Sequence, residues 1–65
     1  MNKLLIVRNR LGITQSEVER VTGIDTSTLS LYENGIRTPT VKNAKILGEL
    51  YGIPWTEFFE ENEEL

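Results

Sequence analysis

The chain has 65 residues and a formal net charge of −3, and it contains no cysteine and no histidine. Disulfides and the usual zinc ligand sets are therefore excluded, and a chain this short is expected to form one domain, 1–65, with a small core. The apolar run at the N-terminus is short and is interrupted by Arg8. We therefore expect neither a signal peptide nor a membrane span, and we expect a cytoplasmic protein.

The acidic charge is concentrated at the C-terminal end of the sequence. Residues 1–56 contain all seven lysines and arginines but only five acidic residues, whereas the last nine residues contain five glutamates and no basic residue. The larger part of the chain is thus mildly basic, which is compatible with a phosphate-binding face. We expect residues 60–65 to form an acidic tail that keeps the domain soluble.

Glycines that can end helices and residues that can cap them divide the chain into five predicted helices. Four glycines follow stretches with helical apolar spacing, where glycine adopts the left-handed conformation: Gly12, Gly23, Gly35 and Gly52. Thr14 and Glu17 fit a capping box, Asp25 and Thr40 are further N-caps, and Pro54 opens the last helix. The helices are predicted at 2–11, 15–22, 26–34, 41–51 and 55–62, and no segment has the alternation of a strand.

Apolar residues at helical spacing form the predicted core. They are Leu4, Val7, Leu11, Val18, Val21, Ile24, Leu29, Tyr32, Val41, Ala44, Leu47, Leu50, Ile53, Trp55, Phe58 and Phe59. The aromatic cluster formed by Tyr51, Trp55, Phe58 and Phe59 is more typical of a core than of an interface. An exposed part of it would favour a homodimer, with Phe59 and Leu65 as contacts. Gly48, inside helix 41–51, predicts a close approach between helices.

A very short turn around Gly23 separates the predicted helices 15–22 and 26–34, which is the spacing of a helix-turn-helix motif. Over residues 4–59 the chain resembles the phage-repressor (Cro/cI, XRE) family. The resemblance is carried by Ile13-Thr14-Gln15, Thr22-Gly23-Ile24-Asp25, Ser27-Thr28-Leu29-Ser30, Tyr32-Glu33-Asn34-Gly35 and Pro39. It implies an all-α, compact five-helix lambda-repressor-like domain with the helix-turn-helix at about 15–34. It also implies a bacterial or phage-encoded transcriptional regulator, more often a repressor, that binds a palindromic double-stranded DNA operator as a homodimer.

The outer side of helix 26–34 carries hydroxyl groups and one leucine, and it has no lysine or arginine. Hydroxyl groups bond base edges or phosphates, and apolar groups contact thymine methyl groups. We expect base contacts, favouring A·T-containing steps, from Thr26, Ser27, Thr28 and Leu31. Two alternatives stay open. Ser27 and Thr28 could serve only the amides of the first helical turn, and Leu31 could contact a second copy of the chain or a protein partner.

The expected phosphate contacts flank this helix. They are Gln15, Ser30, Asn34, Arg37, Thr38 and Lys42. The resemblance implies that Gln15, at the start of helix 15–22, holds a phosphate oxygen with help from the helix N-terminus. Arg37 is the strongest single candidate because a planar guanidinium binds two oxygens. Asn34 has an alternative role as the cap that ends helix 26–34.

The resemblance further implies a partly buried structural ion pair between Arg8 and Glu33.

Two positions depart from the family pattern. Glu19 stands where alanine is usual, which puts close packing of helices 15–22 and 26–34 in doubt. Leu31 stands where a polar or basic residue is common.

An enzyme is not expected, because the chain lacks histidine, cysteine and a phosphate-cradling glycine loop and is too short for a deep pocket. We expect no cofactor, no metal and no small-molecule ligand. The alternative function is a protein-interaction module, antitoxin-like or adaptor, on the same fold, which the low basic charge and Leu31 favour. Salt dependence distinguishes the two, because phosphate contacts weaken steeply with salt and apolar contacts do not.

Overall fold

The computed structural model describes residues 2–59, and every regular element in that range is helical. Four α-helices, α1 (Lys3–Leu11), α2 (Gln15–Thr22), α3 (Thr26–Glu33) and α4 (Val41–Tyr51), precede a short 3-10 helix, η1 (Trp55–Phe59). The predicted all-α fold and the order of its five helices are confirmed. The last helix differs from the prediction, because its described part is a 3-10 helix of five residues and the expected acidic tail lies outside the described residues.

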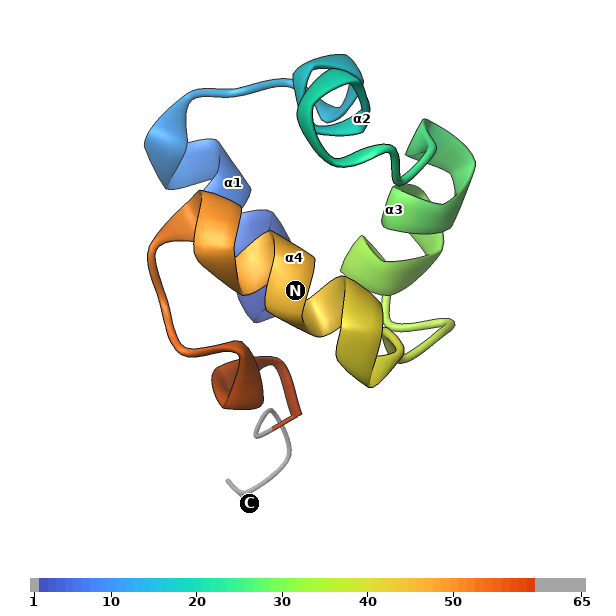
Figure 1. Ribbon diagram of the computed structural model, residues 1–65. Helices are drawn as coiled ribbons and strands as arrows, with labels where there is room; N and C mark the ends of the chain where they lie inside the picture. Colours follow the sequence, from blue (N-terminus) through green and yellow to red (C-terminus); the bar gives the residue numbers. More distant parts are fainter. Residues whose placement is uncertain (1, 60–65) are drawn as a thin grey trace.

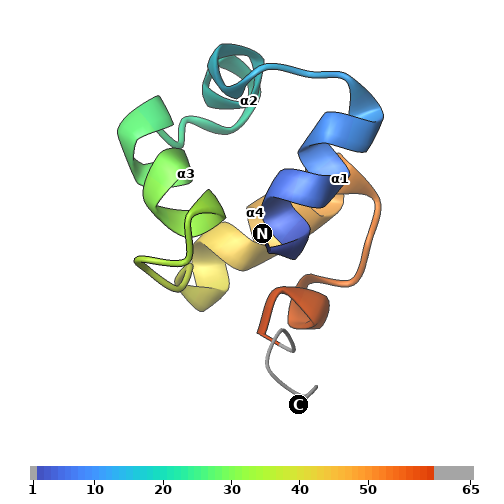
Figure 2. The same cartoon turned by 180° about the vertical axis from the view of Figure 1, so that it is seen from behind.

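The helices pack around one core, with α2 and α3 on one side of α4 and η1 on the other side (Figures 1 and 2). Helix α1 contacts α3, α4 and η1, and therefore links the two sides of the domain. An exposed ion pair of 3.1 Å between Lys3 and Glu57 joins the start of α1 to η1. Among residues 2–59, no helix has the length and the apolar character that a membrane span needs.

The helix ends follow the capping chemistry of the sequence. Thr14 and Glu17 form the predicted capping box at α2, and the Thr40 hydroxyl accepts a hydrogen bond from the backbone N–H of Asn43 at α4. Asp25 occupies the N-cap position of α3, as predicted. However, its carboxylate makes no cap hydrogen bond within the described part of the chain. The start of α3 therefore depends on the turn before it rather than on a side-chain cap.

The turn between α2 and α3 is held by its own side chains and backbone. Gly23 has a φ of +81°, in the left-handed region, and its N–H donates to the carbonyl of Glu19. The Thr22 hydroxyl donates to the carbonyl of Val18 at 2.7 Å and accepts from the N–H of Ile24 at 3.1 Å. These bonds use the backbone groups that a helix end leaves free, so the angle between α2 and α3 is determined locally.

The buried core contains most of the predicted residues. It comprises Leu4, Val18, Ile24, Leu29, Tyr32, Ala44, Leu47, Tyr51 and Phe58, with Val7, Leu50, Ile53 and Trp55 packed against it. Ile13 and Ile46 also pack there, although they were not predicted. Edge-to-face stacking of Tyr51 on Phe58, with ring centroids 6.3 Å apart, joins α4 to η1 within this core.

The core prediction is wrong for four residues. Leu11, Val21, Val41 and Phe59 are between 39% and 61% exposed. Each lies in the first or last two residues of its helix and faces solvent there. Helical spacing identifies the apolar face of a helix, but it does not show how far along that face the neighbouring helices reach.

Gly48 marks the close approach that its position in α4 predicts. A Cβ atom on Gly48 would lie 2.9 Å from the carbonyl oxygen of Ile53 and 3.1 Å from both Cα and Cβ of Trp55. Backbone atoms cannot move away as the end of a flexible side chain can. The absence of a side chain at Gly48 therefore lets η1 pack directly on α4.

We predict that Gly48→Ala lowers the free energy of unfolding by up to about 2 kcal/mol. Overpacking costs about 1–3 kcal/mol, and the better helix propensity of alanine offsets about 1 kcal/mol of it. Urea denaturation measures the change, with Glu49→Ala at the neighbouring exposed position as the control. A more stable Gly48→Ala variant would contradict the close approach of η1 to α4.

Candidate nucleic-acid interface

A buried ion pair between Arg8 and Glu33 connects α1 to the end of α3. Arg8 Nε donates to Glu33 Oε2 at 2.6 Å, and Arg8 Nη2 donates to Glu33 Oε1 at 3.0 Å. The side chains are only 13% and 3% exposed. Such a bidentate pair is short and directional, and it holds both side chains in one orientation. The two residues that the family resemblance pairs are thus directly bonded in the structure.

Two further hydrogen bonds extend this pair to the start of α2. Arg8 Nη1 donates to the carbonyl of Ile13 at 2.9 Å, and Gln15 Nε2 donates to Glu33 Oε1 at 3.0 Å. We call Arg8, Gln15 and Glu33 the buried polar cluster. Because it bonds the residues before and at the first turn of α2, it positions that helix end relative to α1 and α3.

Tyr51 lies beside the buried polar cluster and is influenced by it. The hydrogen bond to Glu33 raises the pKa of Arg8, while burial opposes the rise. Burial raises the pKa of Tyr51 to about 12, the charge of Glu33 adds to the rise, and Arg8 opposes it. The hydroxyl of Tyr51 is buried and has no hydrogen-bond partner among residues 2–59. Tyr51 therefore contributes packing and not a hydrogen bond to this region.

The expected base-contact residues lie along α3 with unequal exposure. Ser27 is exposed, and Thr26, Thr28 and Leu31 are half-buried. Their neighbours Leu29 and Tyr32 are buried in the core. The side of α3 that faces away from the core is therefore the side with the expected base contacts. Apart from the buried Glu33, that helix has no charged residue. Its accessible side therefore offers hydroxyl and methyl groups.

An open hollow lies where the ends of three helices meet. It is lined by Arg8, Asn9, Gly12, Ile13, Thr14, Gln15, Ser16 and Thr26. The hollow brings together two residues of different expected roles, Gln15 from the start of α2 and Thr26 from the start of α3. The N–H groups of Gln15 and Ser16 in the first turn of α2 are at the same place and favour an anion, while the Glu17 carboxylate of the capping box opposes it.

Two other expected phosphate contacts bond to each other rather than standing alone. Asn34 Nδ2 donates to Ser30 Oγ at 3.3 Å, one helical turn earlier. Asn34 is also the C-cap of α3, where its N–H donates to the carbonyl of Ser30. Its capping position and its exposure are thus compatible with both roles that the sequence left open.

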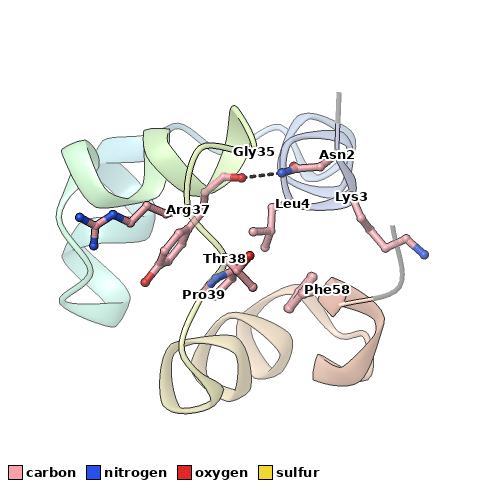
Figure 3. A pocket seen from close by; sticks show the side chains of 9 residues that line it. Asn2, Lys3, Leu4, Gly35, Arg37, Thr38, Pro39 and Phe58 are labelled. Atoms are coloured by element: carbon pink, nitrogen blue, oxygen red, sulfur yellow. Dashed lines mark hydrogen bonds between the residues drawn. The ribbon is translucent and has the colours of Figure 1, made fainter. Parts of the chain in front are cut away.

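The loop between α3 and α4 carries the exposed residues Arg37 and Thr38, and Lys42 is exposed in the first turn of α4. The carbonyl of Leu31 accepts hydrogen bonds from the N–H groups of Ile36 at 3.0 Å and Arg37 at 3.2 Å. A small cavity of about 40 Å³ lies behind this loop, and Arg37 points away from it (Figure 3). The loop is thus bonded to the end of α3, and its guanidinium is directed outward.

The sequence matches the model of a known family. The helix-turn-helix family matches residues 4–58. The chain belongs to this helix-turn-helix family. The curated relative YqaF of Bacillus subtilis (strain 168), an uncharacterized HTH-type transcriptional regulator, is 40% identical over 63 residues, which cover 94% of this chain and 83% of YqaF. No solved structure matches the chain. The resemblance inferred from the sequence motifs is confirmed.

The sequence did not predict the hydrogen bonds that join the expected DNA-contact residues to the rest of this helix-turn-helix domain. The bond from Gln15 to Glu33 joins a proposed phosphate contact to a structural ion pair, and nothing in the spacing of the two residues indicates it. The doubt raised by Glu19 is removed, because this side chain is exposed and α2 still packs against α3. A glutamate is accepted there because its carboxylate reaches solvent.

We predict that Glu33→Gln lowers the free energy of unfolding by roughly 3 kcal/mol, because it leaves the Arg8 guanidinium buried without its counter-charge. In contrast, Glu57→Gln, which breaks the exposed pair with Lys3, is expected to cost less than about 1 kcal/mol. Chemical denaturation of both variants measures the difference. Equal small losses would show that the buried pair contributes no more than a surface pair.

The raised pKa of Tyr51 predicts a loss of stability at high pH. The tyrosine ionises near pH 10 in the unfolded chain and near pH 12 in the folded protein. Its contribution is therefore complete below pH 10 and is lost as the pH rises to 12, with a slope of up to about 1.4 kcal/mol per pH unit. Tyr51→Phe should reduce this slope without lowering stability at pH 7, because the hydroxyl has no partner within the described residues. Denaturation at several pH values measures both effects, and an unchanged slope would contradict the assignment.

Proposed function

We propose that this protein is a sequence-specific, double-stranded DNA-binding transcriptional regulator that inserts α3 into the major groove. The observation that carries the proposal is the accessible outer side of α3, which lies in a helix-turn-helix of fixed geometry and is free of charged side chains. Membership of the helix-turn-helix family and the printed description of YqaF support it. The function is binding rather than catalysis.

We propose base contacts by Thr26, Ser27, Thr28 and Leu31. A hydroxyl group both donates and accepts a hydrogen bond, so serine and threonine can pair with either kind of base-edge group. Arginine, which makes the commonest contact to guanine, does not occur on α3. The readout therefore favours A·T-containing steps, and most of the electrostatic attraction must come from residues outside α3.

The proposed phosphate contacts supply that attraction from both sides of α3. The Gln15 side-chain nitrogen carries two hydrogens, of which Glu33 accepts one within the described residues, so the other can bond a phosphate oxygen. The free N–H groups at the start of α2 favour the same anion. Arg37, with Thr38 and Lys42, would hold the backbone on the other side. Ser30 and Asn34 would contact it at the end of α3.

We further propose that the protein acts as a repressor and that two copies bind a palindromic operator in the bacterial cytoplasm. Only Arg37 and Lys42 contribute a full positive charge to the proposed contacts of one copy. A second copy doubles these phosphate contacts and the length of sequence that is read. Two half-sites about one helical turn apart suit such a symmetric pair.

One observation favours a second candidate function, a protein-interaction module on the same fold. Ile36 is 69% exposed, its N–H donates to the carbonyl of the half-buried Leu31, and adjoining exposed apolar side chains can mark a protein-binding surface. Binding of a partner protein over both residues would give the chain an antitoxin-like or adaptor function. Its affinity would depend little on salt, which distinguishes it from binding to phosphates.

The proposed function is tested by selecting bound sites from random DNA duplexes and footprinting the protein on them. We expect one sequence motif, repeated as an inverted pair with half-site centres roughly 34 Å apart. If the selection yields no preferred sequence and the affinity for DNA does not respond to salt, the proposal is contradicted and the interaction module is favoured.

We predict that Arg37→Ala weakens binding to all duplexes to a similar degree. Each phosphate contact contributes about −0.9 to the slope of log affinity against log salt concentration, so the variant should lose about that much per protomer. Fluorescence anisotropy at several salt concentrations measures the slope. Arg10→Ala, which removes an exposed cation from α1, is the matched control and should leave the slope unchanged. An identical slope in the Arg37 variant would show that this side chain does not bind a phosphate.

A further inference from the structure

One side chain on the outer side of α3 differs in chemistry from its neighbours. Leu31 is half-buried, yet it is not one of the partly buried hydrophobic residues that pack against the core. The surrounding accessible residues of α3, Ser27, Thr28 and Ser30, have short hydroxyl side chains. Leucine is longer, and its branched end has no polar atom. It therefore presents an apolar group on a face that is otherwise able to form hydrogen bonds.

The backbone of Leu31 is fixed to the loop that carries the strongest proposed phosphate contact. Its carbonyl accepts the N–H groups of Ile36 and Arg37, at 3.0 Å and 3.2 Å. A movement of the Arg37 backbone would break one of these bonds. The position of Arg37 on a phosphate would consequently determine which base pair faces Leu31.

We propose that Leu31 recognises the C5-methyl group of a pyrimidine in the major groove. The inference rests on the proposed function and adds the base-edge group that is recognised. The thymine methyl is the methyl group that unmodified base edges present in this groove, whereas cytosine has only a hydrogen at C5 and the polar edge groups there are hydrogen-bond donors and acceptors. Leucine placed against one of those would remove it from water without replacing its hydrogen bond, which is unfavourable. Each half-site of the operator therefore has one thymine opposite Leu31.

The same contact makes the protein sensitive to cytosine methylation. 5-Methylcytosine has its methyl group at the position of the thymine methyl, but it has an amino donor where thymine has a carbonyl acceptor. The hydroxyls of Ser27 and Thr28, which belong to the proposed base contacts, can accept or donate and therefore tolerate this exchange. A methylated C·G pair at this position is bound better than an unmethylated one.

The test uses the selected operator with single thymines replaced by uracil, which removes only the methyl group. At one thymine per half-site we expect the affinity of the natural protein to fall about fourfold. Burying one methyl group strengthens binding by about that factor. At the same position, 5-methylcytosine should bind about fourfold more tightly than cytosine. Anisotropy titrations measure both ratios, and neither requires a protein variant.

The variant Leu31→Ala assigns the effect to this side chain. We expect it to bind the thymine and uracil operators equally, while Val21→Ala, an exposed apolar truncation on α2, keeps the fourfold ratio. Circular dichroism shows whether both variants remain folded. If the thymine-to-uracil ratio is unchanged in Leu31→Ala, another residue contacts the methyl group and the inference is wrong.

The result separates this inference from the proposed function. If the operator is bound with steep salt dependence but no thymine is sensitive to uracil, methyl recognition is wrong and the regulator stands. If no duplex is preferred and a protein partner instead protects Leu31, both are wrong.

Discussion

The Arg8–Glu33 pair is the constraint on which the arrangement of this small domain depends. It is almost entirely removed from water, and each of its two charges is compensated by the other and by hydrogen bonds to Ile13 and Gln15. A buried charge without such partners would be very unfavourable, so alternative packings of the helices are penalised. The pair therefore holds α1 against the helix-turn-helix, in which the turn at Gly23 sets the angle between α2 and α3.

The proposed DNA contacts depend on that placement. Gln15 bonds the buried carboxylate, and the loop that carries Arg37 is bonded to the carbonyl of Leu31. One proposed phosphate contact on each side of α3 is thus attached to a fixed point of the domain. Because α3 has no accessible charged side chain, these flanking contacts would set the depth and register of its hydroxyl and methyl groups.

The sequence predicted the features that are determined locally. The capping box at Thr14 and Glu17 and the left-handed glycines depend on neighbouring residues alone, and the helix boundaries agree to within a residue for α1 to α4. The close approach at Gly48 was also evident, since glycine is unfavourable inside a helix without a packing reason. Membership of the helix-turn-helix family followed from motifs of the same local kind.

Features that depend on tertiary contacts could not be predicted in the same way. Leu11 and Val21 have core spacing but are exposed, and Asp25 occupies a cap position without making the cap hydrogen bond. The bond from Gln15 to Glu33 joins residues 18 positions apart, whose side chains meet only after three helices have packed. For the candidate interface, the sequence therefore indicated the residues, whereas their mutual connections required the structure.

The central claim is that the buried polar cluster positions the proposed interface in addition to stabilising the fold. The most direct test replaces the ion pair by an apolar pair, Arg8→Met with Glu33→Leu, and measures both stability and affinity for the selected operator. A well-packed apolar pair can restore the stability that a broken ion pair loses. We expect near-normal stability but about tenfold weaker binding, because Gln15 has lost the acceptor that orients it. A stable double variant that binds the operator with unchanged affinity would contradict the account.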